Sequence, residues 1–193
     1  MNKLAIVTSV LALAVSSAKA QTSIWITDPA HSEVDFITRR FDMTDVSGRF
    51  GRVTGELDLN EADVTRSVVK MTIDLASVDT KDQVRDEHLR SEAFFEVLVF
   101  PTATFVSTSV TRNGSSLLIT GNLSLHGFTR PVTLNVNVAE EAARIGLDKK
   151  LHTKYEATAT IKRSNFAIGA AYPNAAIGDE VKLAIKLDTV KKQ

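Results

Sequence analysis

The chain has 193 residues and a mass of 21.0 kDa, and its 23 basic side chains balance 23 acidic ones. Hydrophobic residues make up 44% and charged residues 24%, which is typical of a globular protein and argues against a disordered or membrane-spanning class. Zero net charge argues against nucleic acid as a partner, because phosphate binding needs a basic excess, and the lack of cysteine excludes disulfides, thiolate metal sites and CxxC redox chemistry.

The first twenty residues have the pattern of a secretory leader. A short basic start precedes a mostly apolar run at residues 4–15, and Ala18-Lys19-Ala20 fits a small-x-small cleavage site. The apolar run is too short to span a bilayer as a permanent helix. We therefore expect residues 1–20 to be a cleaved signal peptide and residues 21–193 to form one domain. A Gram-negative periplasm is the expected destination.

The mature chain alternates apolar and polar side chains in about eight segments, a pattern that predicts β-strands with one face in water. In the fourth segment, Thr104, Val106 and Val110 are assigned to one face and Phe105 to the other. The segments are residues 33–36, 52–59, 69–75, 104–110, 117–125, 132–138, 155–162 and 181–188.

The polar faces belong in water, so all the apolar faces must share one interior. A sandwich or a closed barrel satisfies this requirement. The interior of an eight-stranded barrel is just wide enough to be filled by side chains or to hold one small ligand. The inward side chains here are mostly aliphatic and of modest volume. A closed barrel would therefore leave an apolar lumen that suits a lipid chain.

Alternation stops between residues 79 and 100. Asp79 or Thr80 can cap a short helix on which Val84 and His88 share one side, and Pro101 ends the segment. We expect a helical insert around residues 80–96 that covers one end of the barrel or sheet. The phenylalanines that plug this end, or line a cavity there, are Phe94, Phe95, Phe100 and Phe105.

Little in the sequence points to catalysis or to a metal. The histidines His31, His88, His126 and His152 lack the spacing of a zinc site. The sequence has no G-x-S-x-G elbow and no glycine-rich phosphate loop. We therefore predict no enzymatic activity, no metal and no cofactor.

Two polar clusters interrupt the regular pattern. Residues 28–32 (DPAHS) are either a polar site at a barrel mouth or a turn held by Asp and Ser side chains, and the turn is favoured. Residues 85–90 (RDEHLR) are either a head-group contact at a pocket entrance or the solvated face of a short helix. Local ion pairs would support such a face, and this interpretation is favoured.

The order and spacing of several motifs resemble the YceI-like family of small secreted lipid-binding proteins over nearly the whole mature chain. The motifs are DPAHS at 28–32, GRF at 48–50, RDEHLRS at 85–91, PTATF at 101–105, GNLSLHGFTRPV at 121–132, IKRSNF at 161–166 and IGDEV at 177–181. The resemblance implies an all-β, lipocalin-like eight-stranded antiparallel barrel. It also implies a periplasmic location and an apolar tunnel for a polyisoprenoid or similar amphiphile, such as an isoprenoid quinone or fatty amide.

The chain departs from the family's pattern at one segment. Family members often carry a histidine where Arg39 and Arg40 stand here. A guanidinium binds a phosphate or carboxylate bidentately, so an arginine there would favour such a head group. An exposed arginine pair without a ligand is equally compatible with the sequence.

We predict a periplasmic binding protein that sequesters or carries one long-chain isoprenoid or similar lipid. Burial of each methylene group supplies about 0.8 kcal/mol of driving force. Transient membrane contact and a homodimer stay open. One alternative is a lipid-modifying enzyme that uses His31 or His88 as a base near Asp28 or Asp86. The other is a stress-response scaffold with a filled core.

The predicted ligand-binding residues are inward apolar side chains, aromatic side chains that close or shape one end, and polar side chains at the mouth. They are Phe36, Val69, Met71, Ile73, Leu75, Phe94, Phe95, Phe105, Leu123, Leu125, Val136 and Ile185, with His31, Arg85, His88 and Arg163 at the mouth. Inward side chains packed together without a tunnel would contradict this prediction.

Overall fold

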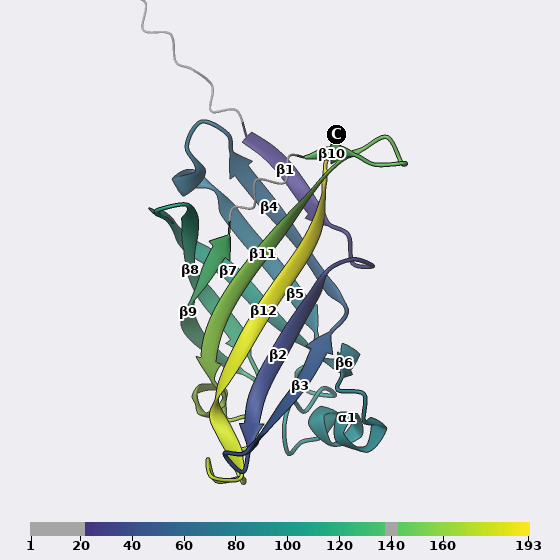
Figure 1. Ribbon diagram of the computed structural model, residues 1–193, viewed down its shortest axis with the longest axis vertical. Helices are drawn as coiled ribbons and strands as arrows, with labels where there is room; N and C mark the ends of the chain where they lie inside the picture. Colours follow the sequence, from purple (N-terminus) through teal and green to yellow (C-terminus); the bar gives the residue numbers. More distant parts are fainter. Residues whose placement is uncertain (1–21, 138–142) are drawn as a thin grey trace, which may run out of the picture.

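The computed structural model describes residues 22–137 and 143–193, so the predicted signal peptide and Val138 lie outside the described residues. The fold is almost entirely β-structure (Figure 1). One α-helix, α1 (Gln83–Arg90), and three short 3-10 helices, η1 (Val64–Arg66), η2 (Leu75–Ser77) and η3 (Arg163–Phe166), accompany the strands. The strands are β1 (Thr22–Thr27), β2 (Glu33–Arg40), β3 (Thr44–Phe50), β4 (Val53–Asn60), β5 (Val68–Asp74), β6 (Val78–Asp79), β7 (Thr102–Asn113), β8 (Ser116–Leu125), β9 (Phe128–Asn137), β10 (Arg144–Ile145), β11 (Leu151–Lys162) and β12 (Ile177–Lys191).

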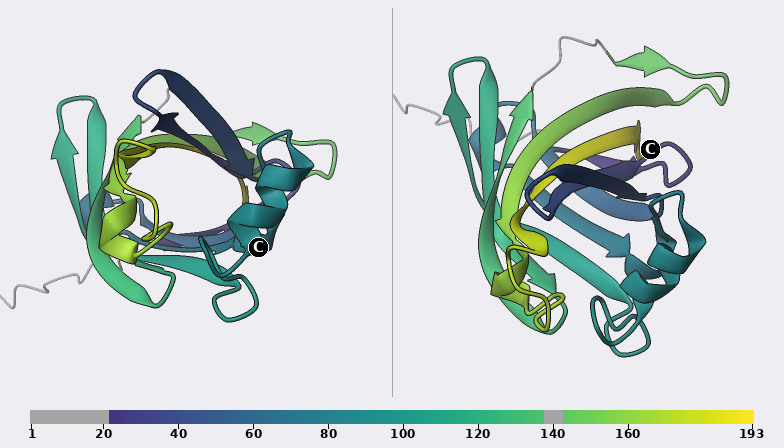
Figure 2. Two further views of the ribbon diagram at one scale, coloured as in Figure 1. Left: turned by 90° about the horizontal axis from the view of Figure 1, so that it is seen from below. Right: turned by 60° about the horizontal axis from the view of Figure 1, so that its bottom comes forward.

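Eight of these strands close into an antiparallel barrel. The ring runs β1-β4-β5-β7-β8-β9-β11-β12 and closes because β12 pairs with β11 on one edge and with β1 on the other. The end-on view in Figure 2 shows the strands surrounding a single interior. The predicted lipocalin-like barrel is therefore confirmed, and the sandwich alternative is wrong.

The long strand β12 explains how β2 and β3 belong to the same wall. Its residues 189–191 pair with β1, and its residues 177–186 pair with β2. The chain bends between β1 and β2, where Asp28 Oδ1 accepts a hydrogen bond from Ala30 N at 3.0 Å. Ser32 Oγ donates to Asp188 O at 3.2 Å and so ties the bend to β12. The favoured interpretation of residues 28–32 as a turn is confirmed.

The helix α1 and the turns that follow it lie at one end of the barrel, beside the β2–β3 hairpin (Figures 1 and 2). The predicted insert is present, but its cap is Asp82, whose Oδ1 accepts from Arg85 N at 3.1 Å. The predicted caps Asp79 and Thr80 are wrong because Thr80 is buried. Its backbone N and its Oγ1 donate to Asp86 Oδ1 at 2.8 and 2.6 Å.

The segment 85–90 is therefore more than a solvated helix face. Glu87 is exposed, but Asp86 is buried against Thr80. Arg90 donates through Nε to Ala76 O at 2.9 Å and through Nη2 to Val78 O at 2.6 Å. These bonds fasten α1 to the chain around β6, so the helix holds a fixed position at the end of the barrel.

A bulge in β7 corrects the predicted faces of that strand. The register with β8 shifts between Ser107 and Ser109, which inserts one extra residue. Val110 therefore joins Phe105 on the buried inner face, whereas Val106 is exposed outside. The assignment of Val110 to the same face as Thr104 and Val106 is wrong because strict alternation does not cross a bulge.

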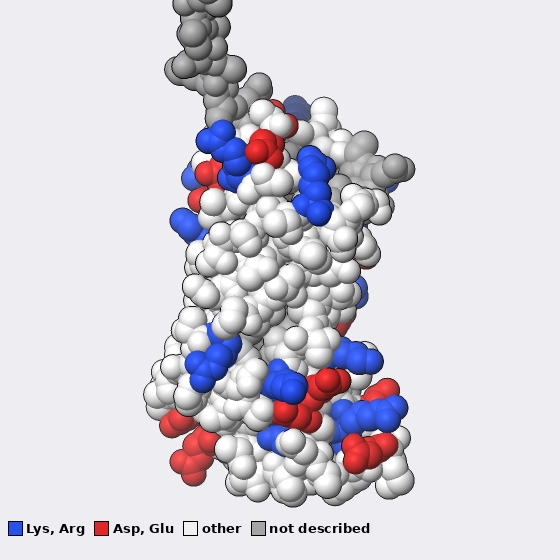
Figure 3. All heavy atoms as spheres, turned by 90° about the vertical axis from the view of Figure 1, so that its left-hand side faces the viewer, with Lys and Arg blue, Asp and Glu red and all other residues white. Residues whose placement is uncertain are grey.

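One face of the outer wall of the barrel carries little charge in its middle (Figure 3). On the face shown in Figure 3, charged side chains gather toward the two ends. Between β8 and β9, hydroxyls pair across the strands: Thr120 with Thr133 at 2.9 Å, and Ser124 with Thr129 at 2.7 Å. Within the described ranges, no helix has the length and apolar character needed to cross a membrane.

Gly121 allows a close approach between β7 and β8. A Cβ atom at this position would lie 2.4 Å from Phe105 Cζ and 2.5 Å from Val106 O. The ring of Phe105 therefore occupies the space that a side chain on β8 would need. This contact explains why a glycine interrupts the apolar inner face of β8.

Replacing Gly121 by alanine should lower the free energy of unfolding by about 1–3 kcal/mol, because the added methyl overpacks the wall. Gly51 provides the matched control, since no atom lies within 4 Å of a Cβ built there. Gly51→Ala should leave stability unchanged or raise it by about 0.4–1 kcal/mol. Urea unfolding of both variants checks this, and equal effects would refute the contact argument.

Candidate functional site

The barrel contains two adjoining cavities along its interior. The outer cavity, at the α1 end, has a volume of about 460 Å³, and the inner cavity has a volume of about 260 Å³. Val34, Ile73, Leu123 and Leu183 line both, so the two spaces meet at these side chains. Together they fall within the roughly 300–1,000 Å³ range of small-molecule sites. The filled-core scaffold does not describe this structure.

The inner cavity is lined almost wholly by apolar side chains from eight of the strands. Among the described residues that line it, only Ser67 and Tyr155 carry a polar side-chain atom, and none carries a charge. Burial raises the pKa of the Tyr155 phenol above its ordinary value, so the phenol stays neutral at physiological pH. The inner cavity therefore suits an uncharged apolar chain.

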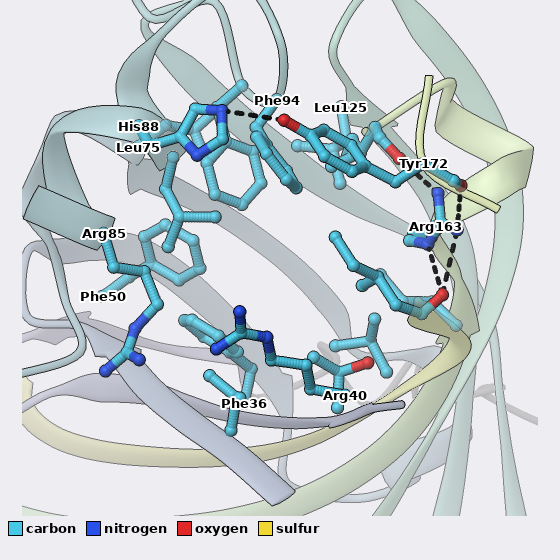
Figure 4. Close-up of a pocket in the computed structure, with 18 of the residues that line it drawn as sticks. Phe36, Arg40, Phe50, Leu75, Arg85, His88, Phe94, Leu125, Arg163 and Tyr172 are labelled. Atoms are coloured by element: carbon cyan, nitrogen blue, oxygen red, sulfur yellow. Dashed lines mark hydrogen bonds between the residues drawn. The ribbon is translucent and has the colours of Figure 1, made fainter. Parts of the chain in front are cut away.

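The outer cavity combines an aromatic wall with polar side chains at its opening (Figure 4). Phe50 lies 5.5 Å from both Phe36 and Phe95, measured between ring centroids. Phe94 stacks on Tyr172 with centroids 5.3 Å apart. Edge-to-face and offset contacts of this kind fix ring positions beyond simple burial.

Among the described residues, charged side chains enter the lining only at this end. Tyr172 Oη lies 3.1 Å from His88 Nε2, which joins the loop before β12 to α1 across the opening. Arg85 donates through Nε to Thr80 Oγ1 at 2.7 Å. Arg40 lies over the Phe41 ring with its Cζ 5.1 Å from the centroid. The lined space is therefore polar at one end and apolar at the other.

Arg163 corrects one predicted role. Its side chain lines the outer cavity, but the residue is 5% exposed and its guanidinium bonds to the backbone. Nη1 donates to Ile168 O at 3.0 Å and Gly169 O at 2.9 Å, and Nη2 donates to Tyr172 O at 2.8 Å. Arg163 therefore holds the loop that presents Tyr172, and its donors are not available to a head group.

The structure brings fifteen of the sixteen predicted residues to the two cavities. Their role in binding a ligand stays a prediction. The outer cavity receives Phe36, Leu75, Arg85, His88, Phe94, Phe95, Leu125 and Arg163, the inner cavity receives Val69, Met71, Phe105, Val136 and Ile185, and both receive Ile73 and Leu123.

His31 is the residue that lies elsewhere. It lines neither cavity, and its exposed Nδ1 lies 2.8 Å from Asp28 Oδ2 at the β1–β2 bend. His88 bonds to Tyr172, while Asp86 Oδ1 is occupied by Thr80. The His31–Asp28 pair therefore lies away from the two cavities, and His88 and Asp86 each bond to another residue.

Two further differences concern aromatic and metal-binding side chains. Phe105 lies in the inner cavity against Gly121, not with Phe94 and Phe95 at the helical end. No sequence pattern marks Tyr172 as a cavity residue, because it stands alone in a loop without periodicity. In the described part of the chain, no three His, Asp or Glu side chains gather as ligands for a metal ion.

Comparisons with known proteins identify relatives of this architecture. The family described as the YceI-like domain matches residues 25–189. Protein YceI of Salmonella newport is 36% identical over 163 residues, covering 84% of this chain and 83% of the relative. A UPF0312 protein of Pseudomonas aeruginosa is 35% identical over 164 residues, with the same coverage of both chains.

Solved structures share the same barrel. BcnA of Burkholderia cenocepacia superimposes with a TM-score of 0.74 at 26% identity, over 84% of this chain and 98% of that one. A domain of Saccharophagus degradans, described as polyisoprenoid binding and implicated in plant cell wall breakdown, superimposes with a TM-score of 0.60. At 19% identity over 87% of this chain and 98% of that one, it shows the shared fold alone.

Replacing Arg163 by lysine should lower the free energy of unfolding by about 2 kcal/mol or more, because an ammonium group cannot reproduce the forked contacts. Arg49, an exposed arginine on β3 that pairs with Glu33, is the control. Arg49→Lys should change stability by less than about 0.5 kcal/mol. Thermal and urea unfolding measure both, and a silent Arg163→Lys would contradict the role given to this residue.

Proposed function

The chain belongs to the YceI-like family, and from this premise we propose that it binds one long-chain isoprenoid or similar amphiphilic lipid inside the barrel. The observation that carries the proposal is the change in polarity along the two cavities, from the inner end to the opening. Its inner part bears no charge, whereas arginine, histidine and tyrosine side chains border its opening. The apolar tail would occupy the inner cavity, and the head group would remain at the opening.

The free energy of burying hydrocarbon favours a ligand with a long apolar tail. Each methylene group moved from water into the cavity contributes about 0.8 kcal/mol, so many methylenes together outweigh the cost of ordering the chain. The lining is mainly valine, leucine and isoleucine, which contact a branched hydrocarbon as readily as a straight one. The fold of the family is a binding-protein fold, and the polyisoprenoid-binding relative supports an isoprenoid ligand by likeness of fold.

We further propose that the protein acts in the periplasm as a carrier or a store for this lipid. The leader pattern of residues 1–20 supports this location. A long apolar chain needs shelter from water when it leaves a membrane. Protein isolated from its own cells should then begin at Gln21.

Loading and release would occur during contact between the open end and a membrane. Apolar side chains project there from separate loops: Met43 is 84% exposed on the β2–β3 hairpin, and Leu98 is 97% exposed after α1. Exposed Phe41 and Val84 continue this surface into the lining of the outer cavity. A surface of this kind marks an interaction site, and here it leads directly to the cavity.

Shortening the inner cavity tests the proposed function. Ala157 lines it, so Ala157→Leu should displace about three carbons of the tail and weaken binding of the longest chains by about 2 kcal/mol, while shorter chains bind as before. Ala184 does not line either barrel cavity, and Ala184→Leu should change nothing. Affinities for a series of isoprenols of increasing length check this. An unchanged length preference in Ala157→Leu would refute the assigned tail position.

Removing the apolar side chains at the open end tests the membrane contact. The double variant Met43→Ser, Leu98→Ser should transfer lipid from vesicles about tenfold more slowly, with unchanged affinity at equilibrium. Ile145 and Leu147, equally apolar and exposed, lie on the β10–β11 hairpin at the other end (Figure 1). Serine at these two positions should leave the transfer rate unchanged, and equal slowing by both pairs would contradict docking through the open end.

A further inference from the structure

The inner face of β2 ends in a charge. Val34 and Phe36 are buried on this face, and by the two-residue period of a strand Thr38 and Arg40 continue the same row. All four residues line the outer cavity. Arg40 therefore stands where the apolar wall meets the opening, which is the position that a head group takes when the tail lies inside.

Four arginines line this cavity, Arg39, Arg40, Arg85 and Arg163, and among them Arg40 is the one whose guanidinium has no hydrogen bond or ion pair within the described residues. Within residues 22–137 and 143–193, its guanidinium contacts the Phe41 ring and makes no hydrogen bond or ion pair. Its neighbour Arg39 pairs through Nε with Asp45 Oδ1 at 3.4 Å, across the β2–β3 pair. Arg163 is saturated by backbone carbonyls. Five N–H donors of Arg40 thus remain for a ligand.

A second cation and a hydroxyl border the same opening. In Figure 4, Arg40 reaches from β2 toward the open space, Arg85 lies on the α1 side, and Tyr172 lies opposite. Asp82 is the one acidic side chain among the described residues of this lining, and its Oδ2 lies 3.6 Å from Arg85 Nη1. The positive charge of Arg40 therefore has no counter-charge within the lining.

This arrangement has different consequences for different head groups. A lipid seated at the opening removes water from the Arg40 guanidinium, which costs free energy unless an anion replaces that water. A carboxylate or a phosphate would accept two parallel hydrogen bonds from the guanidinium and balance its charge. An alcohol or amide head group would neither accept both hydrogen bonds nor balance the charge. The site therefore disfavours neutral head groups through the desolvation cost of Arg40 and also attracts anionic ones.

We propose that the opening of this barrel selects amphiphiles with an oxyanion head group, a carboxylate or a phosphate ester, through Arg40. The inference rests on the proposed lipid-binding function and specifies its ligand class. Arg85 and Tyr172 border the same opening, but Arg85 Nε and Nη2 already donate to Thr80 and Tyr172 Oη already bonds to His88 Nε2, so the selection is assigned to Arg40.

The test compares ligands that share one chain. Binding of geranylgeraniol, geranylgeranyl monophosphate and geranylgeranoic acid is measured by titration calorimetry, with inorganic phosphate as a fourth probe. The intact protein should bind the two anionic lipids at least about tenfold more tightly than the alcohol, as expected for charge-assisted bonds. Inorganic phosphate alone should bind at least a hundredfold more weakly than the phosphorylated lipid, because it has no chain to bury.

Variants of Arg40 test whether this residue causes the preference for anionic lipids. Arg40→Gln should remove most of the preference for anions and leave affinity for the alcohol unchanged or improved. Arg40→Lys should keep part of the preference, because the charge remains but the forked geometry is lost. Arg49→Gln removes the same charge from the outer face of β3 and should keep the full preference. Since Arg40 is exposed, the variants should fold, which their thermal unfolding confirms.

The outcomes distinguish a failure of the head-group inference from a failure of the lipid-binding proposal. Equal affinity for all three lipids, or a preference that persists in Arg40→Gln, would overturn the head-group inference while the lipid-binding function stands. Failure of every lipid to bind would overturn the proposed function itself. Tight binding of inorganic phosphate without a chain would show a free-phosphate site and would also overturn the inference.

Discussion

The closed ring of strands keeps the inner walls of this protein apart. Backbone hydrogen bonds around the ring, completed by β12 with β11 and β1, set the distance between opposite walls independently of the side chains between them. Valine, leucine, isoleucine and alanine on those walls are too small to meet across the interior at every level. Space therefore persists inside the core, whereas two sheets free to approach would have closed it. Gly121 shows where the walls do interlock, because Phe105 fills the gap that the glycine leaves.

Charge is confined to one end of this space, and the side chains there have distinct tasks. Arg163 and Asp86 are buried and satisfied by the protein itself, and they hold in place the loop and the helix that frame the opening. Arg40 lies on the same rim without such partners. Satisfied polar groups of the first kind rigidify a structure, while an uncommitted cation beside an apolar cavity is suited to a ligand. Two arginines at one opening thus serve stability and recognition separately.

Most of the architecture could be predicted from the sequence because strand alternation reports directly which side chains face inward. Prediction from strand alternation failed where local hydrogen bonding overrides the pattern. The bulge at Ser107 reversed the face of Val110, and the bond from Thr80 to Asp86 moved the helix cap to Asp82. Tyr172 and the saturation of Arg163 depend on a loop that closes through tertiary contacts, and no periodicity reports such contacts. Arg39 and Arg40 look alike in sequence and both line the outer cavity, but only the structure shows that Arg39 pairs with Asp45 whereas Arg40 contacts the Phe41 ring.

Native mass spectrometry of the protein isolated from its own cells without detergent tests the central claim most directly. We expect a chain that begins at Gln21 and carries one lipid, which is lost on denaturation and recovered in an organic extract as a long-chain amphiphile. The extract also identifies the head group. A native mass equal to that of the bare polypeptide, in protein that retains its fold, would contradict the claim that the cavities hold a lipid.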